Sequence, residues 1–208
     1  WACQNGAHVV SMSFGGTGFS QSFQNLINAF PQIVFLAAAG NSNVTTLTYP
    51  GAYTNVICVG SVDANDLRSS FSNYNGGANP YVDIAAPGGY SFGGLLSTVY
   101  STGGNSYAKM GGTSMATPFA AGLVGLMLSV NPSLSPQQIL SCLTSSGVNI
   151  NQNIGPRINA FGAMQCASQG LTAGAPISNF FGIPTTLLEG DSVMYYENCS
   201  NGGNAIGS

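Results

Sequence analysis

The segment GGTSMATPFAAG, residues 111–122, joins a pair of glycines to a threonine, a serine and a run of small apolar residues. The glycines favour a tight turn, and Thr113 or Ser114 suits the N-cap of the helix that the apolar run predicts. The free N–H groups and positive dipole at a helix N-terminus stabilise an alkoxide or a neighbouring oxyanion. The segment therefore allows two interpretations: a capped buried helix, or a serine nucleophile held at a helix N-terminus.

The chain before this helix alternates between continuous apolar runs and helical spacing. One segment, FSQSFQNLINAF from Phe19 to Phe30, places its apolar residues at helical intervals. Four runs predict buried strands: AHVVSMSFGG, QIVFLAAAGNSN, NVICVGSVD and YVDIAAPGG. Strands that are apolar throughout and joined by helical segments indicate a parallel sheet covered on both faces. We therefore expect an α/β fold.

The second half of the chain predicts a hairpin and further helices. LLSTVYSTGGNSYAKM resembles a hairpin, and FAAGLVGLMLSV, residues 119–130, is too short an apolar run to span a bilayer and predicts a buried helix. NPSLSPQQILSCL predicts another helix, with Ser135 as N-cap and Pro136 in the first helical position.

The composition excludes several classes of partner. Charged residues make up 4% of the 208-residue chain, and the formal net charge is −3. A chain without a cluster of Lys and Arg cannot neutralise phosphates or hold an anionic membrane surface. We therefore expect neither nucleic acid nor membrane as a partner, and a globular chain made soluble by Asn, Ser, Thr and Gln, as in many secreted proteins.

The cysteines argue against zinc and for an oxidising compartment. The five cysteines form no CxxC pair and have no histidine at metal-ligand spacing, so no metal site is assigned. Cys142 lies in a predicted helix and Cys166 in the segment after it, so a disulfide between them is expected, with two separate buried thiols as the alternative. The odd count leaves at least one of Cys3, Cys58 and Cys199 free or paired outside this chain.

Several motifs in series resemble those of one family. GTSMATPFAAG resembles the active-serine motif of the subtilisin-like serine proteases, or subtilases; VVSMSFGG resembles their substrate-lining strand and AAAGNSN the segment of the oxyanion asparagine. YPGAYTNVICVGSVD, SSFSNYN and VDIAAPG continue the resemblance in register, over about residues 1–168. It implies a three-layer α/β fold with a mostly parallel central sheet, of which this chain holds the C-terminal part.

The resemblance also implies roles for individual residues in a serine endopeptidase. Ser114 matches the nucleophile that forms an acyl-enzyme, and Asn41 matches the donor that stabilises the oxyanion together with the Ser114 N–H. Two further sets match substrate-binding positions, with small uncharged pocket walls that favour a large apolar side chain before the scissile bond. The strand edge that pairs with a polypeptide substrate is Ser13, Phe14 and Gly15, and the pocket walls are Ala38, Ala39, Gly40 and Thr48.

The sequence departs from the family in its general base. A subtilase has an Asp and a His upstream of the serine, but the one histidine, His8, precedes the substrate-lining strand, and Asp63, Asp66 and Asp83 have no histidine to orient. We therefore expect a fragment that needs the N-terminal half of its catalytic domain as a partner and is inactive alone.

The sequence argues against one rival function, that of an α/β-hydrolase, and leaves another, a non-catalytic binding module, open. The α/β-hydrolase motif G-x-S-x-G fails because Ala116 stands at its last glycine and no histidine follows. A non-catalytic protein-binding or adhesion module on a protease scaffold stays open: the intact Ser114 and Asn41 argue against it, and the missing Asp and His argue for it.

The composition changes near the C-terminus. We expect residues 1–170 to form the catalytic part, 171–178 a linker and 179–208 the start of a β-sandwich that resembles a PKD repeat. Such repeats follow secreted proteases, which implies an extracellular protein. The family often binds structural Ca²⁺ through loop carbonyls, and YPGAYTNV offers some, but too few acidic residues are present to assign an ion. No cofactor is expected.

Overall fold

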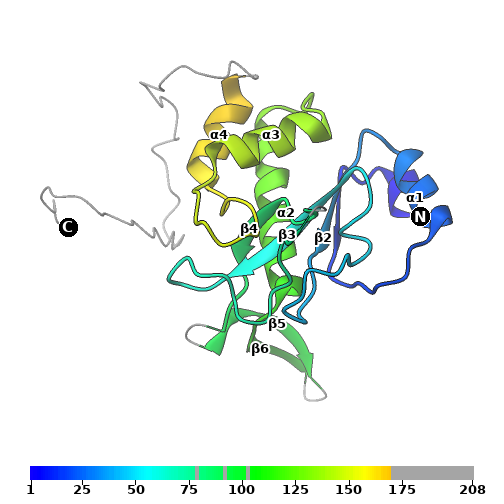
Figure 1. Ribbon diagram of the computed structural model, residues 1–208. Helices are drawn as coiled ribbons and strands as arrows, with labels where there is room; N and C mark the ends of the chain where they lie inside the picture. The colour runs from blue at the N-terminus through cyan, green and yellow to red at the C-terminus, as the bar shows by residue number, and fades with distance from the viewer. Residues whose placement is uncertain (78–79, 91–92, 102–103, 170–208) are drawn as a thin grey trace, which may run out of the picture. The chain divides into compact units, whose positions relative to one another are not determined.

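The computed structural model describes residues 1–77, 80–90, 93–101 and 104–169 (Figure 1). The linker predicted at 171–178, the β-sandwich predicted at 179–208 and Cys199 lie outside the described residues.

A parallel sheet of four strands forms the centre of the fold (Figure 1). The strands are β1 (Val9–Met12), β2 (Val34–Ala38), β3 (Val56–Val62) and β4 (Ile84–Pro87), in that order across the sheet. Val10 pairs with Phe35, Leu36 with Ile57, and Gly60 with Ala85. The predicted α/β class with a mostly parallel sheet is confirmed, and all carboxyl ends of the strands meet at one edge.

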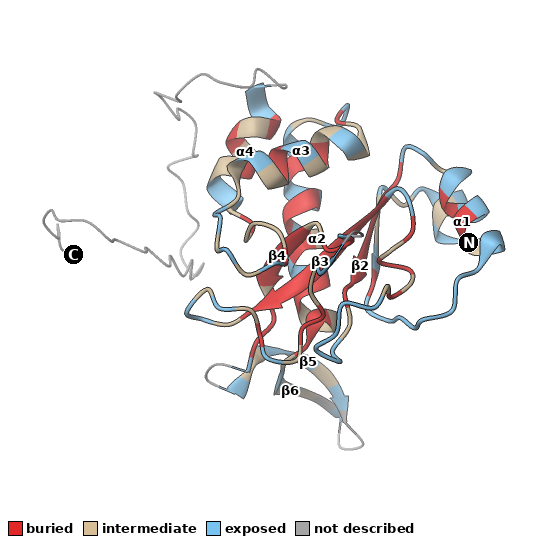
Figure 2. Ribbon diagram, viewed as in Figure 1, coloured by how far each residue is buried: buried red, intermediate tan, exposed pale blue. Residues whose placement is uncertain are grey.

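Helices cover the sheet because each central strand sends alternate side chains to opposite faces. In β2, Val34 and Leu36 join the core beneath α2 (Thr113–Val130), α3 (Pro136–Ser146) and α4 (Ala160–Gln169). Phe35 and Ala37 face the other way and pack with Ile27 of α1 (Gln21–Asn28). A short 3-10 helix, Ala2–Asn5, precedes β1. Figure 2 shows β2 and β3 buried between these layers.

Local signals fix the helix starts. The side chain of Ser20 accepts a hydrogen bond from the Phe23 N–H and so begins α1. Ser135 and Gln138 form a reciprocal capping box with Pro136 in the first turn of α3, which confirms the predicted cap. A disulfide joins Cys142 of α3 to Cys166 of α4, as predicted, while Cys3 and Cys58 are free thiols.

Two predicted buried elements are more exposed than expected. In β1 only Met12 is buried, because β1 is the edge strand of the sheet and has a neighbour on one side only. Helix α2 begins at Thr113 with Gly112 as its N-cap, so the predicted N-cap at Thr113 or Ser114 is wrong. By length and composition this helix could cross a membrane. It packs against all four strands, however, which makes it the central helix of this fold, with one face left exposed.

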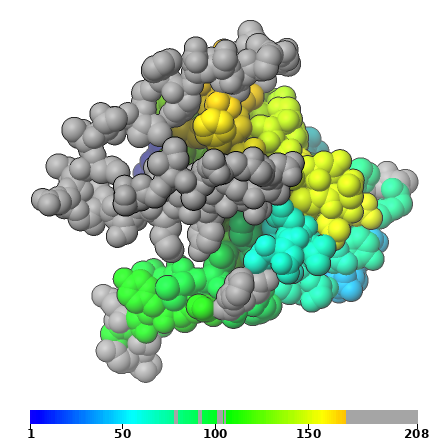
Figure 3. Space-filling view, turned by 90° about the vertical axis from the view of Figure 1, so that its left-hand side faces the viewer, coloured from blue at the N-terminus to red at the C-terminus, as the bar shows by residue number. Residues whose placement is uncertain are grey.

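A hairpin leads into α2. Strands β5 (Leu95–Ser101) and β6 (Gly104–Met110) pair antiparallel and project from the rest of the fold, at the lower left of Figure 3. The predicted hairpin is therefore confirmed. The glycine pair before Ser114 follows directly after β6, which ends at Met110.

Candidate active site

Ser114 is the second residue of α2, at the carboxyl edge of the sheet. Gly112 is the N-cap of this helix with φ +155°, a conformation that favours glycine. Its N–H donates to the Gly88 carbonyl oxygen at 2.7 Å, which ties the start of α2 to the end of β4. The Ser114 N–H, as one of the first in the helix, has no acceptor within the helix and can serve a ligand.

Ser13, the residue after β1, contacts Ser114 directly. The Ser114 hydroxyl donates to the Ser13 carbonyl oxygen at 3.2 Å, and the Ser13 hydroxyl donates to the Ser114 carbonyl oxygen at 2.8 Å. The two residues are 101 positions apart in sequence, so the fold itself brings them together. The proton of Ser114 is directed to a backbone oxygen, which cannot act as a general base.

Asn41 follows the end of β2 and is fixed by its side-chain oxygen. Asn41 Oδ1 accepts hydrogen bonds from the Thr113 N–H and the Thr113 hydroxyl, each at 2.9 Å. The Thr113 hydroxyl oxygen also accepts from the Gly40 N–H at 3.2 Å. With the oxygen occupied, Asn41 Nδ2 is oriented as the donor, and a Cβ on Gly112 would lie 3.4 Å from it. The Asn41 amide and the Ser114 N–H therefore lie at the same end of α2.

A cavity of about 300 Å³ lies beside these groups. Five lining residues were not predicted as site residues from the sequence: Gly16, Thr17, Ser42, Asn73 and Thr113. Eight of the nine predicted site residues line the cavity: Ser13, Phe14, Gly15, Ala38, Gly40, Asn41, Thr48 and Ser114. The lining holds no charged side chain, so the cavity suits an uncharged group.

Ala39 is the predicted site residue that does not line the cavity. Its side chain is fully buried in a separate core cluster with Cys58, Tyr81 and Ile154. Neighbouring residues of an extended chain point to opposite faces, so Ala38 can reach the cavity and Ala39 cannot. The Ala39 side chain therefore does not line this cavity. Its carbonyl oxygen accepts hydrogen bonds from Asn73 and Tyr81.

The one histidine does not reach Ser114. His8 precedes β1, and its carbonyl oxygen accepts the Val34 N–H at 2.9 Å. Ser13, which contacts Ser114, follows the other end of the same strand. Five residues of extended chain span roughly 16 Å, so His8 lies far beyond hydrogen-bond reach of the Ser114 hydroxyl.

The three described aspartates all have structural partners. Asp63 Oδ1 accepts the Asn65 and Leu67 N–H groups of its own turn. Asp66 forms an ion pair with Arg157, with 2.7 Å between Asp66 Oδ1 and Arg157 Nε. Asp83 accepts the Cys58 N–H at 2.7 Å and so bridges β4 and β3. Among the described residues, none of these carboxylates orients a histidine.

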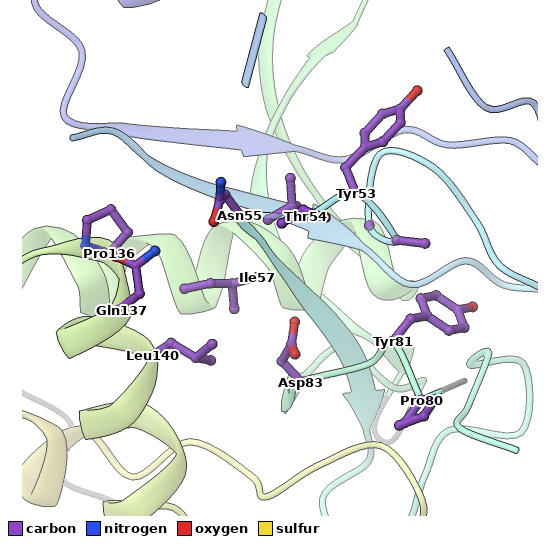
Figure 4. A pocket seen from close by; sticks show the side chains of 13 residues that line it. Tyr53, Thr54, Asn55, Ile57, Pro80, Tyr81, Asp83, Pro136, Gln137 and Leu140 are labelled. Carbon is purple, nitrogen blue, oxygen red and sulfur yellow. The ribbon is translucent and has the colours of Figure 1, made fainter. Parts of the chain in front are cut away.

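Asp83 borders a second cavity, of about 340 Å³, which shares no lining residue with the first (Figure 4). Its carboxylate points among Ile57, Leu140 and Gln137. Burial raises the pKa of Asp83 to about 6, while the hydrogen bond from the Cys58 N–H opposes the rise. Burial and the neighbouring Asp83 charge raise the pKa of the Cys58 thiol.

The described part of the chain contains no metal cluster. No group of three or more His, Cys, Asp or Glu side chains there could hold a metal ion. The segment YPGAYTNV, which lines the second cavity, has Asp83 as its one neighbouring carboxylate in that cavity. Calcium prefers six to eight oxygens, including several carboxylates, so a structural calcium ion stays a prediction without an assigned site.

Comparisons with known proteins point to one family. A sequence profile of the subtilase family matches residues 1–177. Alkaline elastase YaB from Bacillus sp. (strain YaB) is 38% identical over 152 residues, which are 72% of this chain and 37% of that protein. Subtilisin BL from Lederbergia lenta is 37% identical over 152 residues, which are 72% of this chain and 52% of that protein.

Solved structures give the same result. A protease from Pseudoalteromonas arctica superposes with a TM-score of 0.71 and 35% identity, over 78% of this chain and 52% of that one. The self-cleaved protease domain of PatA superposes with a TM-score of 0.70 and 27% identity, over 81% of this chain and 65% of that one. The chain spans about half the length of Subtilisin BL and less of alkaline elastase YaB.

Proposed function

This chain belongs to the subtilase family, and on that premise we propose that it is a serine endopeptidase with Ser114 as its nucleophile. The observation that carries the proposal is the arrangement of Ser114 and Asn41 at the start of α2, beside an uncharged cavity. Acyl transfer uses a nucleophilic hydroxyl and hydrogen-bond donors for the oxyanion, and here a hydroxyl, an oriented amide donor and a helix N–H lie at the same end of α2.

The reaction follows from these groups. Ser114 Oγ forms a bond to the carbonyl carbon of the scissile peptide while its proton passes to a general base. The carbonyl oxygen becomes an oxyanion, which accepts hydrogen bonds from Asn41 Nδ2 and the Ser114 N–H. The C–N bond then breaks, the amine leaves with the proton from the base, and an ester on Ser114 remains. Water repeats the sequence and releases the acid.

The substrate is a polypeptide with a large apolar residue before the scissile bond. The cavity walls contributed by Ala38, Gly40 and Thr48 are small and uncharged, which leaves room for such a side chain. Segment 13–15 continues from β1 along the rim of the cavity and is exposed, so its backbone can pair with an extended substrate as an added strand.

We propose that the general base is supplied from outside these 208 residues, because His8 is their one histidine and lies too far from Ser114. We propose that a polypeptide carrying the Asp and His of the triad, the N-terminal half of the catalytic domain, packs on α2 and β1. Along α2, Phe119, Leu126 and Val130 are 52%, 56% and 48% exposed. Gly122, on the same helix, has no atom within 4 Å of the position of a Cβ.

This exposed face is suited to a second structural layer. An apolar stripe with a glycine lets another element approach closely, and the outer edge of β1 offers unpaired backbone groups to a further parallel strand. A strand added at that edge would extend the sheet beyond β1. We name Phe119, Gly122, Leu126 and Val130 the α2 stripe.

The setting that we propose is extracellular. The Cys142–Cys166 disulfide supports this, since structural disulfides persist in oxidising environments. A non-catalytic binding module is the second candidate, favoured by the hydrogen bond that gives the Ser114 proton to a backbone oxygen instead of a base.

The test combines this chain with the part of Subtilisin BL that it does not match, either mixed or fused. Hydrolysis of a chromogenic peptide with a large apolar residue before the scissile bond is expected, and Ser114→Ala should abolish it. Hydrolysis that persists in Ser114→Ala would contradict the proposal. A folded assembly that binds the peptide without cleaving it would favour the binding module.

A further inference from the structure

Asn73 is a buried polar residue beneath the candidate active site. It follows β3 in sequence, is 2% exposed and lines the cavity beside Ser114. Buried amides are costly unless all their donors and acceptors are satisfied, so the partners of Asn73 show what the residue holds in place.

One side of Asn73 binds the turn that carries Asn41. Asn73 Oδ1 accepts the Ser42 N–H at 3.0 Å and the Val44 N–H at 3.3 Å. The Asn73 backbone N–H donates to the Gly40 carbonyl oxygen at 2.9 Å. Three hydrogen bonds therefore fix the backbone immediately before and after Asn41.

The other side of the same amide binds the wall of the cavity. Asn73 Nδ2 donates to the Ala39 carbonyl oxygen at 2.9 Å and to Thr48 Oγ1 at 3.2 Å. Tyr81 also donates to the Ala39 carbonyl oxygen, at 3.1 Å. One side chain thus connects the end of β2, the turn after it and Thr48.

Gly40 shows how closely the turn lies on Asn73. Its φ is +106°, and a Cβ at this position would overlap the Asn73 amide nitrogen. Above the turn, Thr113 holds Asn41 Oδ1 through two hydrogen bonds. The oxyanion amide is therefore held between α2 on one side and Asn73 on the other.

We propose that Asn73 is a positioning residue that sets the place of the Asn41 amide and, through Thr48, the shape of the cavity. The inference rests on the proposed function, because the position of the Asn41 amide matters for catalysis only if that amide stabilises the oxyanion. An oxyanion donor acts only where it is preorganised, and a shift of about 1 Å in a reacting group can cost ~10²-fold in rate. Asn73 supplies that preorganisation from below the turn without contacting the reacting atoms.

The matched control is Asn75, two residues further along. Asn75 Oδ1 accepts the Tyr81 and Val82 N–H groups, and Asn75 Nδ2 donates to the Val82 carbonyl oxygen, each at 2.8 Å. Asn75→Ala therefore removes a similar hydrogen-bond set from a loop that does not carry Asn41. A general loss of stability should appear in both variants, and a loss of positioning only in Asn73→Ala.

The first experiment needs no activity. NMR of the 208-residue chain should show the Asn41 side-chain amide as one sharp pair of signals, with slow exchange of the Ser42 and Val44 amide hydrogens. In Asn73→Ala we expect exchange at both sites to accelerate by at least about tenfold and the Asn41 signals to shift and broaden. Asn75→Ala should change neither. Unchanged Asn41 signals and exchange in Asn73→Ala would overturn the proposal.

The second experiment uses the assembled enzyme and a double-mutant cycle. Asn73→Ala should lower kcat by ~10- to 10²-fold, more than it changes KM. In the Asn41→Ala background the same substitution should lower kcat by less than about threefold, because the donor is already gone. Equal losses in both backgrounds would refute a positioning role. If the assembly with native Asn73 is inactive, the proposed function fails, and the NMR experiment still decides the role of Asn73.

Discussion

Ionisation of Asp83 should destabilise the fold near neutral pH. Its carboxylate borders the second cavity, is partly buried and accepts a hydrogen bond from the Cys58 N–H at 2.7 Å. Burial raises its pKa from the ordinary value of 3.8 to about 6. Asp83→Asn keeps an oxygen that can accept the Cys58 N–H and removes the charge, so it isolates the cost of ionisation.

The direction in which stability changes with pH follows from proton binding. A carboxyl with a raised folded pKa holds its proton more tightly in the folded chain than in the unfolded chain, so stability falls as pH rises from about 4 to about 7. The gap between 3.8 and about 6 corresponds to about 3 kcal/mol, of which about 2 kcal/mol develops between pH 4 and pH 7. Relative to the parent chain, Asp83→Asn should gain that amount over the interval.

Chemical denaturation of both chains at pH 4, 5, 6 and 7 measures the difference directly. The difference in the free energy of unfolding cancels every other titrating group and should shift by about 2 kcal/mol in favour of Asp83→Asn on going from pH 4 to pH 7. A difference that is constant with pH would show that Asp83 does not titrate in this window. A shift of the opposite sign would show that the folded chain stabilises the ionised carboxylate.

Three further outcomes are expected. In the assembled enzyme, Asn41→Ala should lower kcat by ~10²–10³-fold with KM nearly unchanged, and an unchanged kcat would reduce Asn41 to a turn residue. Peptide mapping without reduction should find Cys142 bonded to Cys166, and two free thiols in exported protein would contradict the disulfide. Replacement of both cysteines by Ala should lower the free energy of unfolding by about 3 kcal/mol, as measured by chemical denaturation. Leu126→Asp should weaken complementation by the rest of a subtilase domain while leaving the melting temperature of the isolated chain within a few degrees, since the side chain is exposed here; undiminished complementation would remove the α2 stripe from the interface.

The secondary structure of this chain could be predicted from the sequence because the residue patterns that indicate helices and strands are local. Continuous apolar runs gave the three strands β2, β3 and β4, and the hydroxyl and proline of Ser135 and Pro136 marked the start of α3. The burial of each element was harder to predict, since it depends on neighbouring elements that the sequence does not show. The apolar residues of β1 and α2 predicted buried elements, but β1 lies at the sheet edge and one face of α2 has no covering layer among the described residues.

Site residues that lie in sequence motifs were predictable, and those that depend on tertiary contacts were not. Ser114 and Asn41 were found through motifs, and the structure places them together. Ala39 was assigned to the pocket by its place in a motif, but the alternation of an extended chain turns its side chain into the core. Asn73 carried no signal of its own beyond the segment SSFSNYN, because its role depends on a tertiary contact with a turn about 30 residues earlier in the chain.

The most direct test of Ser114 as the nucleophile is its labelling by a fluorophosphonate, read by mass spectrometry of the intact chain and its peptides. In this reaction Ser114 Oγ bonds to phosphorus and fluoride leaves, which requires the general base that activates the hydroxyl. We expect rapid labelling on Ser114 when the unmatched part of Subtilisin BL is present, and slow labelling of the 208-residue chain alone. Equal rates in the two samples, or an adduct on another residue, would contradict this expectation.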